Sequence, residues 1–153
     1  MRSLILFLLI ACATTANAAT ELTQAEADQQ LKEGTEAFNQ GEYQKSLNLL
    51  STALQYYEQH SDQQRIADTL YQMGRDYRRL GRFSEALQYL KRAKDLHEQA
   101  GDRQGFGFDL TEIAVTYQRQ GKYVDSFTIS QKALAIHEAT GNQEGLARTL
   151  DNF

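Results

Sequence analysis

"MGRDYRRLGRFSEALQYLKRAK", residues Met73–Lys94, is one of three segments of the chain that align with one another without gaps. The other two begin forty residues to either side, with "EGTEAFNQGEYQKSLNLLSTAL" at Glu33 and "IAVTYQRQGKYVDSFTISQKAL" at Ile113. Glycine stands at the same place in all three, as Gly41, Gly81 and Gly121. Self-similarity at a fixed period indicates stacked structural repeats, each of them one supersecondary unit.

Each repeat predicts two helices. Apolar residues recur three and four apart on both sides of Gly81, which is the spacing of one helix face. Gly81 ends the first helix of its repeat, because glycine adopts the left-handed conformation that a helix C-terminus needs. Asp62, Asp102 and Asn142 stand between the repeats, where we expect them to cap the next first helix. The chain has no proline to break a helix, so we predict an all-α fold.

The same period predicts where the chain divides. We expect a signal peptide, a first and degenerate repeat, two regular repeats and the truncated start of a fourth repeat. Their bounds are 1–18, 19–61, 62–101, 102–141 and 142–153. The last segment continues the period of forty: Leu150 follows Leu110 and Leu70 at that interval, and Phe153 follows Ile113 and Met73. The sequence stops at this point, part of the way into the first helix of a repeat. We therefore expect the sequence to be a fragment of a longer protein, and the isolated chain to be marginally stable or self-associating.

The repeat resembles the tetratricopeptide repeat. The resemblance is carried by Gly74-x-x-Tyr77, by the turn Gly81-x-Phe83 and by Ala86 and Ala93, and it extends from Ala27 to Phe153. A period of forty is similar to the subtype of kinesin light chains, of Pins-type adaptors and of bacterial secreted proteins, including those with a CHAT protease domain. The resemblance implies a right-handed α-solenoid whose first helices line a concave groove that binds a peptide or protein segment.

Register along the first helices identifies the residues that we expect to face this groove. They are Asn39, Tyr71, Gln72, Arg75, Arg78, Arg79, Thr111, Gln118, Arg119, Arg148 and Asn152. The resemblance also implies that an Asn near the end of the first helix reaches the backbone of the bound peptide. Gln72, Glu112 and Asn152 stand at that place, and only Asn152 has the expected residue type.

Arginine is concentrated in the second repeat. Residues 62–101 carry 8 Lys and Arg against 6 Asp and Glu, whereas residues 19–61 carry 2 against 7. One interpretation is an anion-binding patch that prefers an acidic partner, because guanidinium groups bind carboxylates with two parallel hydrogen bonds. The other is a solvated face that Asp76, Glu85 and their neighbours neutralise.

Composition and motifs exclude several classes of function. The net charge of −4 is unfavourable for binding nucleic acid. His97 and His137 occupy equivalent places near the ends of second helices, which favours a structural or solvent-facing role over metal binding. The sequence has none of the common catalytic or phosphate-binding motifs. We therefore predict a protein that is not an enzyme and has no cofactor and no metal ion.

The first residues predict export. An apolar run from Leu4 to Ala13 follows Arg2, and Ala16-Asn17-Ala18 supplies a cleavage site. The run is too short to span a membrane. The alternative is a lipid anchor at Cys12, within "LIAC". Both alternatives place the protein in the periplasm or outside a bacterial cell.

We therefore predict an exported module for protein–protein interaction. One alternative is the recognition part of a larger secreted CHAT-type protease whose catalytic domain lies beyond Phe153. The other is a scaffold for the assembly of an envelope complex.

Overall fold

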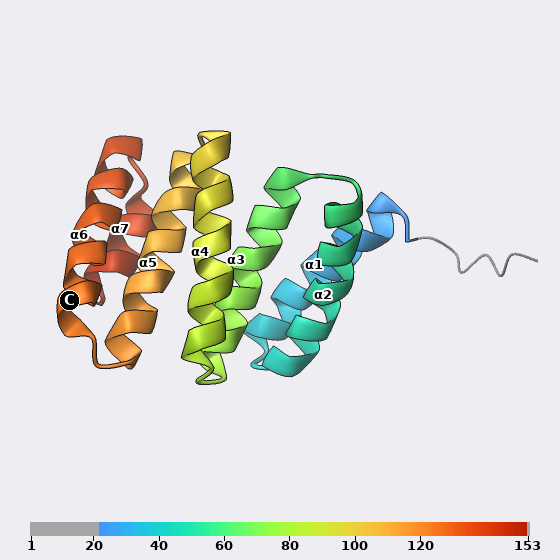
Figure 1. Ribbon diagram of the computed structural model, residues 1–153, viewed down its shortest axis with the longest axis horizontal. Coiled ribbons are helices and arrows are strands. Elements are labelled where there is room, and N and C mark those ends of the chain that lie inside the picture. The colour runs from blue at the N-terminus through green and yellow to red at the C-terminus, as the bar shows by residue number, and fades with distance from the viewer. Residues whose placement is uncertain (1–21, 153) are drawn as a thin grey trace, which may run out of the picture.

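The computed structural model describes residues 22–152, and within that range the chain forms seven α-helices and no strand (Figure 1). The helices are α1 (Gln24–Asn39), α2 (Tyr43–Gln59), α3 (Gln63–Arg79), α4 (Phe83–Ala100), α5 (Arg103–Arg119), α6 (Tyr123–Thr140) and α7 (Gln143–Leu150). The prediction of an all-α fold is confirmed. The predicted signal peptide, Cys12 and Phe153 lie outside the described residues.

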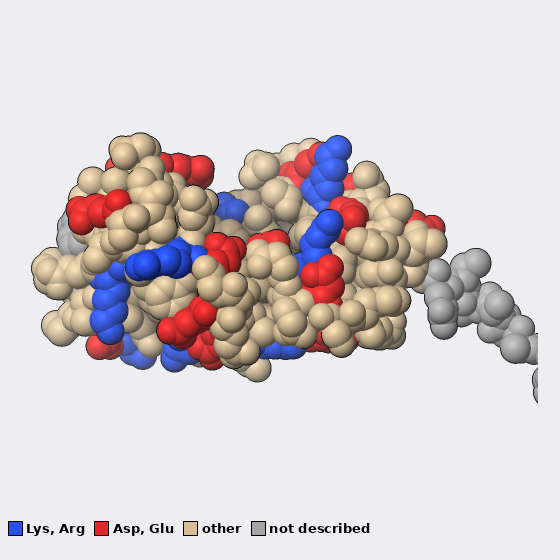
Figure 2. Space-filling view, turned by 90° about the horizontal axis from the view of Figure 1, so that it is seen from above, with Lys and Arg blue, Asp and Glu red and all other residues tan. Residues whose placement is uncertain are grey.

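The helices form two rows. The first helices α1, α3, α5 and α7 lie behind the second helices α2, α4 and α6 in the view of Figure 1. The backbones of neighbouring first helices approach one another all along the array. Within residues 22–152 the backbones of the second helices lie farther apart, and α2 and α4 meet only through side chains, such as the ion pair of Arg92 with Glu58. The array is therefore concave on the side of the first helices. Seen from above, the surface is hollowed on that side, between the two ends of the array (Figure 2).

Side-chain caps begin the first helices, as the sequence predicted. The carboxylate of Asp62 accepts a hydrogen bond from the backbone N–H of Arg65 at 3.0 Å. Asp102 and Asn142 accept the equivalent bonds from Gly105 and Gly145, both at 2.9 Å. Each bond satisfies one N–H that has no partner inside the helix. The helices of successive repeats thus begin at the predicted junctions.

The turn between the helices of a repeat has a left-handed residue. Gly81 has φ of 75° directly after α3, and the N–H of Arg82 then bonds back to the carbonyl of Tyr77 at 2.8 Å. Ser61, at the end of the first repeat, is the one non-glycine residue with positive φ among residues 22–152, at 55°. A side chain is strained in that conformation, so this junction is less favourable than the glycine junctions after it.

Small residues bring the two helices of a repeat together. Ala53, Ala93 and Ala133 are fully buried. A Cβ atom added at Gly74 would lie 2.5 Å from Cγ of Leu90, which shows how closely α3 and α4 approach. Stacking of Tyr77 on Tyr89, with ring centroids 4.9 Å apart, fills the same interface.

Leu150 is less buried than the equivalent residues of the earlier repeats. Leu70 and Leu110 at the equivalent positions are buried, but the Leu150 side chain is 57% exposed. The first two lie in helices with a second helix on each side along the chain. Within the described residues no helix follows α7, so Leu150 has a neighbour on one side only.

Candidate interaction surface

Most of the predicted groove residues belong to the first helices, which form the concave side of the array. Asn39 comes from the last turn of α1, Gln118 and Arg119 from α5, and Arg148 from α7, with Asn152 just beyond it. The remaining candidates come from α3, except for Thr111 in α5; those of α3 are Tyr71, Gln72, Arg75, Arg78 and Arg79. Asn39, Arg79 and Arg119 are exposed, and the other candidates apart from Thr111 are half-buried.

Three guanidinium groups converge on the carboxylate of Glu112. Arg78 donates from Nε to Oε2 at 3.0 Å, and Arg148 donates from Nη2 to Oε1 at 2.8 Å. Nε of Arg75 lies 3.5 Å from the same Oε1. The Glu112 side chain is only 4% exposed. This arginine cluster joins α3, α5 and α7, and its three cations exceed the one buried anion.

Charge around the arginine cluster is only partly balanced. Glu144 lies 3.7 Å from Arg148, but it is largely exposed and so contributes weakly. Arg75 also stacks on the ring of Phe38, with its guanidinium carbon 4.1 Å from the ring centroid, and this contact fixes the guanidinium plane. Burial, together with the charge of Glu112, raises the pKa of the neighbouring Tyr71 phenol to about 12.

The acidic residues expected to neutralise the arginines do not act together. Asp76 is fully buried toward α2, where it accepts a hydrogen bond from Oγ of Ser46 at 2.7 Å. Glu85 pairs with Arg82 at 2.8 Å. Neither residue forms an ion pair with the arginine cluster, although burial raises the pKa of Asp76 and the charge of Arg75 offsets part of that rise. The neutralisation expected from these two residues is therefore direct only between Glu85 and Arg82. The neutralising carboxylate is Glu112.

Two further arginines extend the positive face. Arg79 and Arg119 occupy equivalent positions at the ends of α3 and α5, where the first repeat has Asn39. No carboxylate within residues 22–152 lies at ion-pair distance from either of them, and both are exposed. The guanidinium carbon of Arg79 lies 5.9 Å from the ring centroid of Phe38, and the polar edges of both guanidinium groups are left without a carboxylate among the described residues.

Thr111 does not face the groove. It is 2% exposed, and its hydroxyl lies 3.1 Å from Nε2 of His137 and 2.8 Å from Oγ1 of Thr149. The register that brings Tyr71 to the surface therefore fails at Thr111. The reason is that α7 packs directly over this part of α5, so the equivalent side chain becomes a buried link between α5, α6 and α7.

Gln72, Glu112 and Asn152, which stand where the resemblance implies a peptide-binding Asn, all have partners within the protein. Gln72 accepts a hydrogen bond from Nη1 of Arg75 at 2.8 Å, and Glu112 holds the arginine cluster. Nε2 of Gln118 donates to the backbone carbonyl of Asn152 at 3.1 Å, and the Asn152 side chain turns back to the carbonyl of Arg148. Glu112 is thus engaged within the protein, which agrees with its departure from the residue type that the resemblance implies.

A small cavity of about 270 Å³ opens on the concave face beside the arginine cluster. Thr35, Asp68, Tyr71 and His97 contribute to its lining. His97 is buried, with Nδ1 2.6 Å from Oδ2 of Asp109 and Nε2 3.4 Å from Oδ1 of Asp68. The structural role expected for the equivalent histidines is present, and the solvent-facing alternative is wrong.

Sequence reasoning missed the partners of these buried groups. Tyr57, His97 and His137 are equivalent, and each hydrogen-bonds to a first helix, through Asp28, Asp109 and Thr111 respectively. The repeat register identified the positions as equivalent, and the contact of Tyr57 with Asp28 recurs forty residues later between His97 and Asp68. The contacts with Asp109 and Thr111 have no equivalent in the preceding repeats. No metal-binding group of three His, Cys, Asp or Glu occurs among the described residues.

None of the seven described helices has the length and apolar character that a membrane-spanning helix requires.

The fold and its concave face define a repeat protein of the α-solenoid class. Sequence profiles of the tetratricopeptide repeat match residues 34–99 and residues 110–140. The profile that matches the second range represents the kinesin-light-chain-like subtype. The chain therefore belongs to the tetratricopeptide repeat family, as its resemblance indicated, and its repeats are those of a protein-interaction module.

Two solved structures show the same fold. Aspartyl phosphate phosphatase F from Bacillus subtilis matches with a TM-score of 0.79 and 17% identity, over 82% of this chain and 33% of that chain. The TPR domain of Arabidopsis FLU matches with a TM-score of 0.72 and 20% identity, over 76% of this chain and 98% of that chain. This chain thus spans about a third of the length of the phosphatase. A search of the curated proteins gave no match.

Proposed function

We propose that the concave face binds a protein segment that presents a carboxylate, either on acidic side chains or at its C-terminus. The observation that carries this proposal is the excess of guanidinium groups around Glu112. Three arginines share one buried carboxylate, and Arg79 and Arg119 lie exposed nearby on the same two helices, α3 and α5. A bound carboxylate would supply the missing negative charge in a site whose donors are already oriented.

The exposed arginines would make the first contact with such a segment. Arg79 and Arg119 are equivalent residues on neighbouring first helices, so together they form a row across the concave face. Gln72 offers an amide beside them. The arginine cluster itself is largely built into the fold, because Arg78 is 9% exposed. On this proposal the described part of the chain binds a partner and does not catalyse a reaction.

The test is selection from a random peptide library, carried out on the purified protein. We expect enrichment of peptides rich in Asp and Glu, and loss of that enrichment in the Arg79→Glu, Arg119→Glu double variant. These two positions are better targets than Arg75, because a carboxylate at residue 75 would face Glu112 and could unfold the protein.

Arg92→Glu is the matched control. Arg92 is also an exposed arginine, but it lies on α4 and pairs with Glu58 of α2, in the row of second helices. The Arg92→Glu variant should enrich acidic peptides as strongly as the parent protein does. Equal enrichment of neutral and acidic peptides by the parent, or unchanged enrichment by the double variant, would overturn the proposal.

We also propose that the protein is exported. The support is the apolar run and the Ala16-Asn17-Ala18 site in the sequence. Expression in a Gram-negative host, followed by mass determination of the purified chain, tests this directly. Cleavage after Ala18 predicts a chain that begins at Ala19, and lipidation predicts a modified Cys12. An unprocessed chain in the cytoplasm contradicts both.

A further inference from the structure

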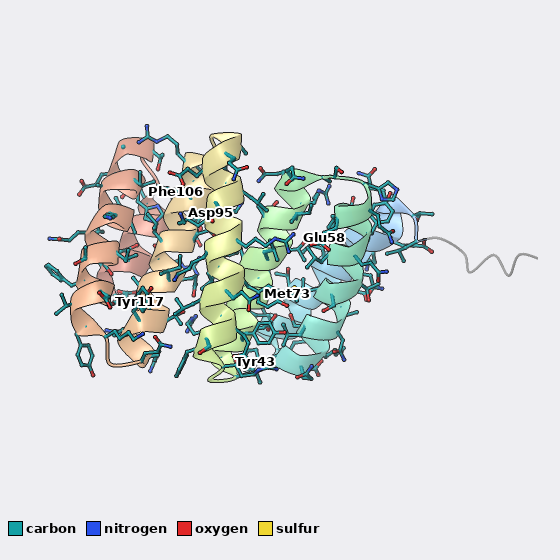
Figure 3. All side chains as sticks on the ribbon, viewed as in Figure 1. Tyr43, Glu58, Met73, Asp95, Phe106 and Tyr117 are labelled. Carbon is teal, nitrogen blue, oxygen red and sulfur yellow. The ribbon has the colours of Figure 1, made fainter. Side chains whose placement is uncertain are left out.

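An apolar cavity of about 630 Å³ lies on the opposite side of the array, between α4 and α6. Phe106, Leu110, Ile113 and Tyr117 of α5 form its floor. These residues recur at the spacing of one helix face, so the cavity is a trough along α5 about 16 Å long. Figure 3 labels Phe106 and Tyr117 at its two ends, on the helix seen between α4 and α6.

Comparison with the preceding repeat explains why this trough is open. The equivalent space between α2 and α4 receives Leu54 and Tyr89, which pack against the buried core there. Forty residues later, Lys94 replaces Leu54 and Ile129 replaces Tyr89. The ring that stacks on Tyr77 in the earlier repeat is therefore missing above Tyr117. These two exchanges leave the apolar floor of the trough uncovered, because Lys94 lacks the branched apolar group of Leu54 and Ile129 lacks the ring of Tyr89.

The rim of the trough is positively charged. Lys91, Lys94 and Lys132 line it, with Asp95 as the one acidic residue. Nζ of Lys94 pairs with Asp95 at 2.7 Å, lies 3.6 Å from Oε2 of Glu98 and lies 5.8 Å from the ring centroid of Phe106. The excess of positive charge on the rim therefore comes from Lys91 and Lys132. Lysine side chains place their methylene groups along apolar surface and their ammonium groups in water. In a protein of net charge −4, this local excess of cations is distinctive.

We propose that the trough between α4 and α6 binds an anionic amphiphile with a single aliphatic chain, such as a medium-chain fatty acid. The chain would lie along α5 in place of the missing Leu and Tyr side chains. The head group would lie among the rim lysines. Burial of apolar surface gives about 25 cal/mol per Å², so most of the binding free energy would come from the chain, and the lysines would select the sign of the head group.

The size of the trough favours a single chain over a protein helix. A cavity of about 630 Å³ is within the range of small-molecule sites, roughly 300–1,000 Å³. A helix 16 Å long and about 10 Å across occupies roughly 1,200 Å³, about twice that volume. A helix would therefore lie over the trough and leave its floor uncovered.

Calorimetric titration of the purified protein with dodecanoate, below its micelle concentration, tests the proposal. We expect saturable binding of one molecule per chain, with hexanoate and dodecyltrimethylammonium each at least tenfold weaker. Binding of the cation as tight as that of dodecanoate would overturn the role of the lysine rim. Absence of saturable dodecanoate binding would overturn the site.

Two variants locate the binding. The Lys94→Leu, Ile129→Tyr double variant restores the residues of the preceding repeat, so it should fold at least as stably as the parent and bind dodecanoate at least tenfold more weakly. Lys132→Glu should weaken the binding of dodecanoate and leave the binding of dodecyltrimethylammonium unchanged. Arg79→Glu, Arg119→Glu on the concave face should leave dodecanoate binding unchanged. If the double variant in the trough binds as the parent does, the ligand lies elsewhere and the proposal fails.

Discussion

The imidazole of His97 and the carboxylate of Asp109 form a buried pair, with Nδ1 2.6 Å from Oδ2. The pair joins α4 to α5, and Asp68 of α3 lies on the other side of the ring. His137, forty residues later, contacts the hydroxyl of Thr111 instead of a carboxylate. Burial alone lowers the pKa of both histidines, but hydrogen bonds with Asp109 and Asp68 outweigh it at His97 and raise that pKa to about 10. Equivalent positions thus hold a cation in one repeat and a neutral ring in the next.

Asp109→Asn should lower the free energy of unfolding at pH 7 by about 2 kcal/mol. Removing one partner of a buried pair commonly costs about 3–5 kcal/mol. The loss is smaller here because Asp68 remains near His97, and because the variant also removes a carboxyl whose pKa burial raises to about 7. Urea denaturation measures the change. Unaltered stability would show that the pair contributes nothing.

The same variant should flatten part of the pH profile. A raised pKa in the folded state stabilises the parent fully below the unfolded pKa of 6.5 and ceases to do so as the pH rises to about 10. The fall in stability between these values should therefore shrink in Asp109→Asn. Thr111→Val at the His137 site is the control, because the pKa of His137 is lowered and its titration falls below this window.

Asp76→Asn should stabilise the protein at neutral pH. Burial raises the pKa of Asp76 from 3.8 to about 6, and the hydrogen bond from Ser46 offsets this only in part. The folded state therefore holds this proton more tightly, and the group reduces stability as the pH rises from about 4 to about 6. We expect Asp76→Asn to exceed the parent by roughly 2 kcal/mol at pH 7 and to match it near pH 4. An equal difference at both pH values would contradict this.

Gly74→Ala should destabilise the fold although alanine favours helix. The added Cβ would meet Leu90 at 2.5 Å, and overpacking of this kind costs about 1–3 kcal/mol, more than the gain of about 1 kcal/mol in helix propensity. Thermal and urea denaturation report the difference. Combined with Leu90→Ala, the substitution should cost less than the sum of the two single changes, because the smaller neighbour makes room.

Val124→Glu should reduce self-association. Val124 is 81% exposed in the first turn of α6, beside exposed Tyr123, and such apolar surface favours association. Light scattering over a range of concentrations should show a lower mean mass than for the parent, with unfolding free energy unchanged to within about 0.5 kcal/mol. Gln44→Glu, at the equivalent exposed position of α2, is the control, and its mean mass should equal that of the parent.

Local signals made the fold predictable. The caps Asp62, Asp102 and Asn142, and the left-handed Gly81, act within a few residues of themselves, so the sequence alone indicates where each helix begins and ends. The fixed period then requires the same packing in each repeat. Leu150 departs from the pattern because burial depends on the next helix and not on the residue itself.

The site was less predictable because its contacts cross between repeats. Arg78 and Arg148 reach Glu112 across 34 and 36 residues of sequence. Register places such residues on one face, but the choice among partners depends on side-chain rotamers and on depth. The same limit explains Thr111, which occupies the position of half-exposed Tyr71 and is buried by α7. Pairs within one helix, such as Arg82 with Glu85, are the ones that spacing reveals.

The repeats of the array are joined mainly through their first helices, whose backbones lie close together, while the backbones of the second helices lie farther apart. Bending such an array changes the spacing of α4 and α6 far more than the spacing of α3 and α5. A molecule wedged between the outer edges would straighten or tighten the inner face without touching it. We therefore expect occupancy of the trough between α4 and α6 to change the curvature that a partner meets on the concave face.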